Sequence, residues 1–319
     1  MKPFSEINVI SLGDLVADLN IRIPGLPVES DRHQVVQSVQ LEPGGAGNFL
    51  LAGARLGLRM TALGVVGADL YGQQMLEILQ SEGIDVRQVI CQTEGNTTLV
   101  FVLADGTGQH VFLGHYGNGP QVSLTEEWKT AIRAADAIQS FGYTLNESRL
   151  TTTMLASMQY ARSQGKPVFF DPGPHVIGVD FHLVSEALAC CTGLLLTEDE
   201  IPLVLPGASG LEAAPRLLTD TTRLVVVKRG PAGCILFTPD ERVEHPGFAV
   251  QMRDTTAAGD SFAAALIGAH LQGRPLREVA AIANAMGAAK VQKPGSGRQV
   301  PTLAEIRQIL VDFSEVIKI

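Results

Sequence analysis

The most constraining feature of this chain is a series of short, continuously apolar runs, each followed by a segment with helical spacing. Runs such as "RLVVVK" and "KPVFFD" are apolar on consecutive positions, which is typical of strands covered on both faces. Segments such as "GQQMLEILQSEG" and "TEEWKTAIRAA" between the runs have the spacing of helices. The alternation predicts βαβ units and a mainly parallel sheet flanked by helices.

Six strands and two long helices follow from this pattern. The expected strands cover residues 9–12, 61–66, 137–141, 168–170, 194–196 and 224–227. The expected helices, rich in alanine, cover residues 259–272 and 276–290. With 319 residues and 45% hydrophobic content, the chain can bury a large core.

Two regions lack helices and alternate between apolar and polar residues. They are "RHQVVQSVQLE" and "TTLVFVLADGTGQHVFLGH", the second folded around the turn "ADGTGQ". Such alternation indicates half-exposed strands. We expect segments of about 17–42 and 96–116 to form a small β lid on the α/β body, where it would cover a ligand.

The charge balance argues against nucleic acid or an anionic membrane as a partner. The net charge is -9, and no run of four lysines or arginines occurs, whereas both partners require a basic surface. The N-terminus lacks the continuous apolar region of a signal peptide, and no segment reaches the ~18 apolar residues of a membrane span. We therefore expect a cytoplasmic protein.

The cysteines and histidines do not indicate a metal site. The four cysteines, Cys91, Cys190, Cys191 and Cys234, lie in apolar surroundings without ligand spacing, and we expect buried reduced thiols. The seven histidines are scattered, which argues against a metal hydrolase.

The first chemically informative segment is the glycine-rich "EPGGAGNFLLAGARLG". Gly44, Gly45 and Gly47 allow the backbone to approach a ligand closely, and Asn48 adds a donor and an acceptor at a helix start. The spacing is that of neither a Rossmann fingerprint nor a P-loop, and an ordinary turn before a helix is the alternative.

The second is "DTTAAGD", residues 254–260, which precedes a helix. The small residues at 257–259 leave backbone N–H groups free at the helix N-terminus, where the dipole also favours anions. Asp260 would stand in the first turn, where a carboxylate can accept a proton from an attacking hydroxyl. The alternative is an aspartate that only caps the helix.

Both segments resemble signatures of the PfkB/ribokinase family of carbohydrate kinases. "DTTAAGD" is similar to the C-terminal signature and "GGAGNFLLAGARLG" to the N-terminal one, in the same order and about 210 residues apart. The segments "GVVGADLYG", "FFDPGP", "KRGPAG" and "VQKPGSGRQVP" extend the resemblance over nearly the whole chain. It implies one ribokinase-like kinase domain over residues 1–319, with the lid segments inserted in it.

The resemblance implies transfer of the ATP γ-phosphoryl group to a hydroxymethyl group of a sugar. Asp260 would be the catalytic base, and Ala257, Ala258 and Gly259 would supply the amides of an anion hole. The sugar would lie against four further residues, of which the Asp18 carboxylate binds two hydroxyls: Asp18, Gly44, Gly45 and Asn48.

On the nucleotide side, the resemblance places Lys228, Gly230 and Gly233 beside ATP. Asn284 would lie beside the adenine, although an exposed polar position on a helix is the alternative. The family commonly has Asn-x-x-Glu near magnesium, and this chain has Thr197 in place of the asparagine and retains Glu200. We expect Mg²⁺ dependence, with Glu200 acting through water.

Ribokinases also hold a monovalent cation near the anion hole. The corresponding positions, most of which would contribute backbone carbonyls, are Asp254, Thr256, Lys290, Lys293, Gly295 and Gln299. Ribokinase itself has a serine where this chain has Gln299. The resemblance implies activation by K⁺.

The chain departs from ribokinase on the sugar side. The glycine loop is one residue shorter and has no lysine, and "QSFGYTLN" places Gly142 and Tyr143 where ribokinase has a glutamate. Tyr143 could stack on a base or line a larger sugar, so ribose is not predicted. The alternatives are a nucleoside kinase, a 2-keto-3-deoxygluconate kinase or a non-catalytic sugar-binding relative. By analogy, the lid could pair two copies into a homodimer.

Overall fold

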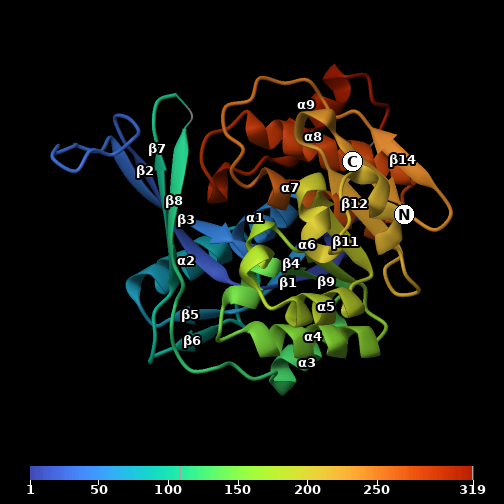
Figure 1. Ribbon diagram of the computed structural model, residues 1–319, viewed down its shortest axis with the longest axis horizontal. Coiled ribbons are helices and arrows are strands. Elements are labelled where there is room, and N and C mark those ends of the chain that lie inside the picture. The colour runs from blue at the N-terminus through green and yellow to red at the C-terminus, as the bar shows by residue number, and fades with distance from the viewer. Residues whose placement is uncertain (108, 318) are drawn as a thin grey trace.

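The computed structural model describes residues 1–107, 109–317 and 319, and its centre is an eight-stranded sheet (Figure 1). The strand order is β14-β13-β12-β11-β10-β9-β1-β4. The six strands from β12 to β4 pair in parallel, while β13 and β14 add an antiparallel edge. Their bounds are β1 Asn8–Leu12, β4 Arg59–Leu63, β9 Ala137–Phe141, β10 Val168–Asp171, β11 Gly193–Thr197, β12 Leu224–Lys228, β13 Cys234–Phe237 and β14 Arg242–His245. The mainly parallel sheet is confirmed.

The strand expected over residues 61–66 is divided in two. Its first half belongs to β4, and its second half is β5 Val65–Gly67, which pairs with β6 Ile90–Gln92 in a separate two-stranded sheet. Gly64 stands at the division, and a Cβ added to it would lie 2.8 Å from the carbonyl oxygen of Gly13. Only glycine therefore fits at position 64, where the chain leaves the main sheet.

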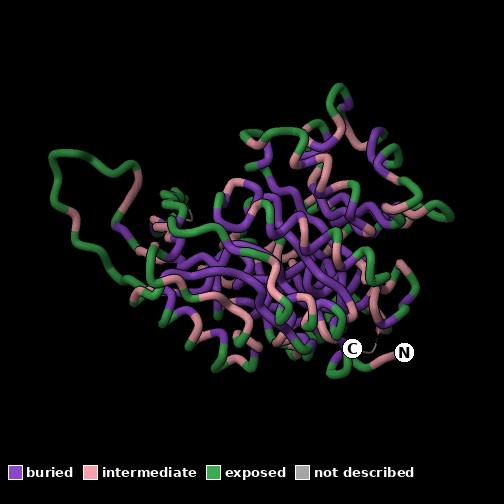
Figure 2. The backbone as a smooth tube through the Cα atoms, turned by 90° about the horizontal axis from the view of Figure 1, so that it is seen from below, coloured by how far each residue is buried: buried purple, intermediate pink, exposed green. Residues whose placement is uncertain are grey.

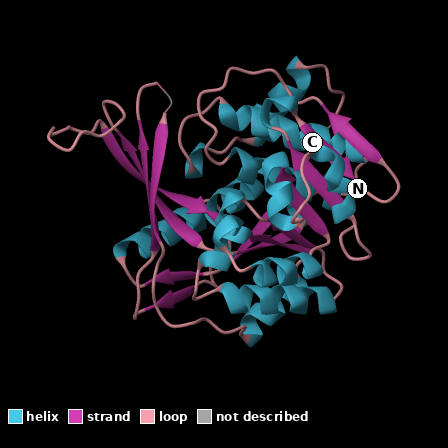
Figure 3. Ribbon diagram, viewed as in Figure 1, coloured by secondary structure: helices cyan, strands magenta, loops and turns pink. Residues whose placement is uncertain are grey.

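Helices cover both faces of the sheet (Figure 3). One layer contains α1 Ala46–Leu56, α7 Ala258–Leu271 and α8 Leu276–Val291, with α9 Leu303–Asp312 against α8. The other contains α3 Glu126–Ala134, α4 Thr151–Ser163, α5 Phe181–Cys190 and α6 Ile201–Val204. The short 3-10 helices are η1 Phe4–Glu6, η2 Gly142–Asn146, η3 Pro174–Gly178, η4 Glu198–Glu200, η5 Leu211–Leu217, η6 Gly230–Ala232 and η7 Gly297–Gln299. The two predicted alanine-rich helices are α7 and α8.

Burial on both faces explains the continuous apolar runs. In β11, Leu195 joins the core under α7 and α8, whereas Leu194 and Leu196 join the core under α4 and α5. In β12, Val226 joins the core under α7 and α8, whereas Val225 joins the core under α4 and α5. Each strand therefore needs apolar residues at even and odd positions alike.

The lid is a four-stranded sheet that projects from the body, at the left of Figure 1. Its order is β3 Ser38–Gly45, β2 Leu15–Arg22, β7 Thr98–Ala104 and β8 His110–His115, with β2 and β7 parallel and the other neighbours antiparallel. Helix α2 Leu70–Ser81 packs under its base. The expected turn at 104–109 includes residue 108, which is outside the described residues.

Two features of the lid differ from the expectation. Residues 32–37 of the first arm form no strand, so that pairing begins only at Ser38. Strand β2 was not predicted, although Asp18, Asn20 and Arg22 alternate there with Leu19 and Ile21. This alternation is the signal of a strand with two different faces.

The burial pattern separates the core from the lid (Figure 2). The sheet layers are buried, whereas the chain between β2 and β3 is largely exposed. Cys190, Cys191 and Cys234 are buried, but the expectation for Cys91 is wrong, because it points outward from the short strand β6. Among the described residues, no helix combines the length and the apolar character needed to cross a membrane.

Candidate active site

The carboxyl ends of the parallel strands carry a lysine–aspartate pair. Asp171 ends β10 and Lys228 ends β12, and Nζ of Lys228 lies 2.5 Å from Oδ2 of Asp171. Burial alone would lower the pKa of Lys228, but the carboxylates of Asp171 and Glu200 outweigh it and raise that pKa. A Cβ added to Gly259 would lie 3.9 Å from the same Nζ, so the lysine stands beside the N-terminus of α7. Asp171 was missed by the sequence analysis, although "FFDPGP" places it at a strand end.

The N-terminus of α7 has the form of an anion site. Ala257 has φ of 60°, in the left-handed region, and stands directly before the helix. The amide of Ala258 donates to the carbonyl of Thr255 at 3.1 Å. Among the described residues, no backbone carbonyl accepts a hydrogen bond from the amide of Ala257 or of Gly259. These two amides are available to a bound anion at the positive end of the helix.

Asp260 stands in the first turn of α7, as predicted, and is half-buried. Burial and then the neighbouring Asp171 raise its pKa to about 7, opposed by Lys228 and by a hydrogen bond from Asn48. The residue before the helix is Ala257, which makes no side-chain cap. Asp260 therefore does not act as the helix cap, and it can exchange a proton near neutral pH.

The acceptor residues expected from the sequence also lie together. Asp18 is buried, and its Oδ2 accepts a hydrogen bond from Oγ of Ser296 at 2.8 Å. A Cβ added to Gly44 would lie 2.0 Å from Oδ1 of Asp18, so only glycine fits beneath this carboxylate. Gly45 has φ of 51° and directly precedes α1, in which Asn48 lies. Burial, Asp260 and Glu42 raise the pKa of Asp18 to about 7, against the hydrogen bond from Ser296.

A C-terminal segment completes this side of the site and was not predicted. Besides Ser296 on Asp18, the amide of Gly297 donates to Oδ1 of Asn48 at 2.8 Å. The guanidinium of Arg298 binds Glu42, with Nη2 2.8 Å from Oε1. The segment "SGR" in the sequence gives no indication of these partners, because they lie 249 to 278 residues away along the chain.

Tyr143 lies at the mouth of the site. Its ring contacts the ring of His175, with centroids 4.8 Å apart, and 41% of the residue is exposed. Burial of the phenol, followed by the charges of Asp260 and Asp171, raises its pKa to about 12. The ring is thus close to the carboxylates while one part stays accessible.

A buried ion pair fixes the base of the lid. Arg149 and Glu147 are almost fully buried, with Nε 3.0 Å from Oε1. Nη1 of Arg149 donates to the carbonyls of Asn96 and Asn118, which flank the hairpin β7–β8. Beside this pair, burial and then Glu147 raise the pKa of Asp14 to about 7. None of these residues was predicted from the sequence.

On the nucleotide side, Thr197 and Glu200 form a capping box. Oε2 of Glu200 accepts from the amide of Thr197 at 2.8 Å, and the Thr197 side chain accepts from the amide of Glu200. Threonine is a good N-cap, which explains how it can stand in place of asparagine. Burial raises the pKa of Glu200, and Asp171 adds to the effect, while Lys228 opposes it.

The remaining residues expected beside the nucleotide lie in and next to η6 and in α8. Gly230 and Gly233 have φ of 54° and 79°, and a Cβ on Gly233 would lie 1.9 Å from the carbonyl oxygen of His245. Asn284 is buried, so the exposed alternative is wrong. Its Nδ2 lies 3.0 Å from Nδ1 of His245 and 3.3 Å from Sγ of Cys234.

The expected monovalent-cation residues also meet. Oδ1 of Asp254 accepts from the amide of Thr256 at 2.8 Å, and Oδ2 accepts from the amide of Gly295 at 2.7 Å. A Cβ on Gly295 would lie 3.5 Å from Cγ of Gln299. No group of three or more His, Cys, Asp or Glu side chains in the described ranges could hold a metal ion.

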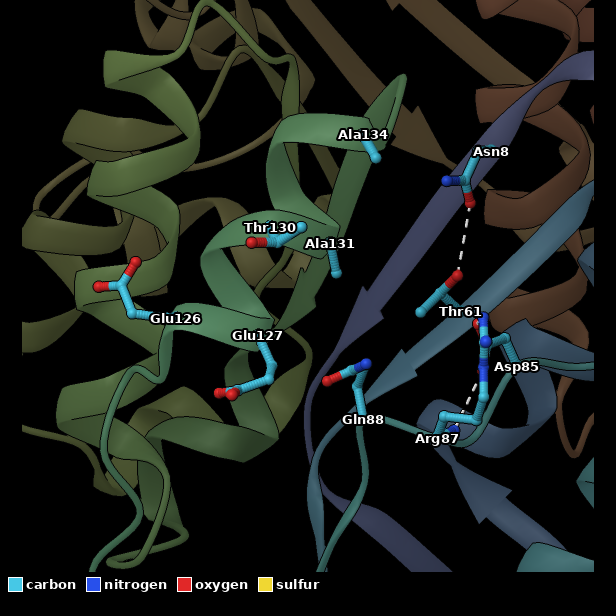
Figure 4. Close-up of a pocket in the computed structure, with 10 residues that line it drawn as sticks. All are labelled: Asn8, Thr61, Asp85, Arg87, Gln88, Glu126, Glu127, Thr130, Ala131 and Ala134. Carbon is cyan, nitrogen blue, oxygen red and sulfur yellow. Dashed lines mark hydrogen bonds and ion pairs between the residues drawn. The ribbon is translucent and has the colours of Figure 1, made fainter.

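Of two hollows in the described structure, one lies away from the candidate site and the other adjoins it. The one in Figure 4, of about 440 Å³, is lined by Asn8 and Thr61 near the amino ends of β1 and β4 and by α3, away from the catalytic edge. The other, of about 520 Å³, lies between the lid and the segments before α7 and η7. Its lining includes Asn20, Arg22, Gln40, Val102, His110, Met252, Arg253, Asp254, Thr256 and Gly295. Asn20 joins this cleft to the acceptor residues, because its Nδ2 donates to Oγ of Ser296 at 3.1 Å.

An anion site at a helix N-terminus, with a carboxylate in its first turn, is an arrangement that suits a phosphotransferase acting on a hydroxyl group. The family model described as "pfkB family carbohydrate kinase" matches residues 6–303. The chain belongs to the PfkB family of carbohydrate kinases.

Individual relatives agree with this family. The chain is 31% identical over 306 residues to an ATP-dependent ribose-1-phosphate kinase of Halopiger xanaduensis, covering 95% of this chain and 98% of that protein. It is 27% identical to a nucleoside kinase of Methanothermobacter thermautotrophicus, covering 93% and 94%. The structure of Arabidopsis thaliana ribokinase complexed with ribose and ATP superposes with a TM-score of 0.81 at 22% identity, covering 96% and 99%. The chain is thus a sugar or nucleoside kinase with the ribokinase fold.

Proposed function

We propose that the protein transfers the γ-phosphoryl group of ATP to a hydroxymethyl group of a sugar or sugar derivative. The observation that carries this proposal is the position of Asp260. Its carboxylate interacts with the charges of Asp171 and Lys228 and with the side chain of Asn48, and its charge also acts on Asp18. Phosphoryl transfer requires mainly positioning, charge stabilisation and one base, and these parts supply all three.

In the proposed reaction, Asp260 accepts the proton of the acceptor hydroxyl as the hydroxyl oxygen forms a bond to the γ-phosphorus. The bond from that phosphorus to the bridging oxygen breaks, and ADP leaves with the bond electrons. The amides of Ala257 and Gly259 and the ammonium of Lys228 stabilise the charge on the transferred group. Asp18 holds the acceptor by its hydroxyls, in an orientation fixed by Ser296 and Gly44.

Mg²⁺ would neutralise charge on the phosphates of ATP. Glu200 and Asp171 are the carboxylates near Lys228 that can bind its water ligands. Because one oxygen of Glu200 is already used in the capping box, the contact through water is the one that fits.

The cleft under the lid favours an acceptor with an anionic substituent, such as a pentose phosphate. Arg22 and Arg253 line this cleft, and within the described residues neither guanidinium forms an ion pair. The carboxylates in the same lining, Asp105 and Asp254, accept hydrogen bonds from amides of their own loops. The ribose-1-phosphate kinase relative agrees with this choice. A nucleoside acceptor is the second candidate, favoured by the exposed ring of Tyr143.

An acceptor panel with Mg-ATP tests this function. ADP release should be fastest with ribose 1-phosphate, slower with nucleosides and slowest with ribose and 2-keto-3-deoxygluconate. Arg22→Ala should raise KM for the phosphorylated acceptor and leave KM for a nucleoside unchanged. Binding of acceptors without ADP release from any of them would favour a non-catalytic sugar-binding protein.

A second copy of the chain is the proposed partner of the lid. Its outer face carries two cross-strand rows of apolar residues: Leu41, Leu19, Phe101 and Leu113 in one, and Val39, Ile21, Leu103 and Val111 in the other. Val39 and Leu113 are 56% and 53% exposed. An apolar patch of this kind on a sheet is a surface for association, and two lids could cover each other.

A further inference from the structure

The last turn of α8 contains a fully buried lysine. Lys290 has no exposed surface, and its Nζ donates to the carbonyl oxygen of Lys293 at 2.9 Å. An ammonium group is rarely buried without charge or dipole partners, because its dehydration is costly. None of the steps proposed above uses this group, and its position therefore requires an explanation.

The surroundings of the ammonium are the two segments that frame the anion hole. Asp254 is the carboxylate that favours its charged form most strongly, and Asp260 also contributes, whereas burial lowers the pKa of Lys290 to about 8. The amides of Arg253 and Asp254 both donate to the carbonyl of Val291, the residue after Lys290. The segment before Ala257 is thereby joined to the end of α8.

Asp254 connects the same two segments a second time. Its carboxylate accepts from Thr256 on one side and from Gly295 on the other. The segment 253–257 ends in the left-handed residue Ala257, whose conformation directs the amides of the anion hole. A positive charge at this junction therefore stabilises the backbone on which the anion hole depends.

These observations do not fit an additional monovalent cation. A free K⁺ ion would need carbonyl oxygens from residues 254–256 and 290–299, and Nζ of Lys290 already binds one of them, on Lys293. It would also stand close to a fixed ammonium, and like charges repel. The two cations would compete for the same partners.

We propose that the ammonium of Lys290 is a tethered cation that takes the place of a monovalent metal ion and makes the enzyme independent of K⁺. Lys290 is a positioning residue, since it acts on the amides of Ala257 and Gly259 through Asp254 and the carbonyl of Lys293. This differs from the K⁺ activation that the family resemblance implies.

The test compares the wild type with Lys290→Met in K⁺, Na⁺ and tetramethylammonium chloride at equal ionic strength. The thermal midpoint is measured without substrates, so that this readout does not depend on the proposed kinase function. The wild type should have the same midpoint and the same kcat in all three salts. The midpoint of Lys290→Met should differ between the salts, unlike that of the wild type, and its kcat in tetramethylammonium should fall about 10²-fold, the scale of losing an anion-hole donor.

K⁺ should then raise both values of Lys290→Met more than tetramethylammonium does, because the vacated position can accept a small cation. Lys129→Met, which removes one positive charge on α3, is the control and should show no response to the salt. A rise of the wild-type midpoint in K⁺ over tetramethylammonium would overturn the inference and needs no variant. A midpoint of Lys290→Met that is the same in all three salts would also overturn it.

Discussion

The two halves of the proposed site are built differently. The phosphoryl half consists of strand ends and one helix N-terminus, so that Asp171, Lys228 and Gly259 meet because a parallel sheet brings its carboxyl ends to one edge. The acceptor half depends on contacts between distant segments, such as Ser296 on Asp18, which are 278 residues apart. The first half follows from the architecture, whereas the second depends on how the lid and the C-terminal segment meet.

This difference predicts that substitutions in the phosphoryl half lower kcat, while those in the acceptor half raise KM. The largest effect should come from Asp260→Asn. Because the amide cannot accept the proton of the acceptor hydroxyl, kcat should fall by about 10³- to 10⁴-fold, the upper range for loss of a general base. Steady-state kinetics measures the change, and ATP affinity by calorimetry should remain close to that of the wild type. Turnover near the wild-type rate would refute the base assignment.

Lys228→Met should have the next largest effect. It removes the positive charge beside the N-terminus of α7 and leaves Asp171 buried without its partner. A loss of about 10²-fold in kcat is expected, with a smaller change in KM for the acceptor. The double variant Lys228→Met/Asp171→Asn should recover thermal stability but not kcat, and recovery of both would remove Lys228 from the chemistry.

Asp18→Asn tests the acceptor half. Because the neutral amide cannot bind two hydroxyls as a carboxylate does, KM for the acceptor should rise about tenfold or more, while kcat at saturation changes less. The same variant should melt at a higher temperature than the wild type at pH 8. Burial raises the pKa of Asp18 from 3.8 to about 7, so the carboxylate destabilises the fold as pH rises through that range. An unchanged KM would exclude Asp18 from the acceptor pocket.

The pH dependence of kcat should have an ascending limb near pH 7. The base must be unprotonated, and burial with Asp171 nearby raises the pKa of Asp260 to about 7. Activity should therefore rise through that value and level off above it. Lys228→Met should shift the limb upward, since that ammonium favours the charged form of Asp260. A flat profile from pH 5 to 9 in the wild type would contradict the assignment.

The smallest effect on catalysis concerns the outer face of the lid. Leu113→Glu places a charge in an apolar row without touching Asp18 or Asn20. If two lids cover each other, this variant should sediment as a monomer while the wild type sediments as a dimer. Phe181→Glu, at an exposed position on α5, is the matched control and should not change the sedimentation. A monomeric wild type would contradict the proposed partner.

The sequence alone predicted the phosphoryl half of the proposed site better than the acceptor half. The parallel strands, α7 and α8 were predicted because periodicity is a local signal, and the grouping of Asp260 with residues 257–259 followed from their adjacency. The grouping of Asp18 with Gly44 and Asn48 came from the family resemblance. Ser296, Arg298 and Arg149 were not predicted, because each acts through a contact with a residue that is distant in the sequence.

Strand β2 was not predicted, although the sequence contains a signal for it. Its alternation of Asp18, Asn20 and Arg22 with Leu19 and Ile21 separates a ligand-facing side from an apolar side. The exposed position of Cys91 could not have been predicted from its apolar neighbours, because it depends on β5 and β6 leaving the main sheet.

The central claim is that Asp260 and the N-terminus of α7 direct phosphoryl transfer to the hydroxymethyl group of an acceptor held by Asp18. The most direct measurement uses Mg-ATP with ribose 1-phosphate and with its 5-deoxy analogue, followed by phosphorus NMR of the products. We predict a new phosphomonoester on the C5 oxygen of the first acceptor, and competitive inhibition without a phosphorylated product for the second. Phosphorylation of the 5-deoxy analogue at a ring hydroxyl would contradict the account.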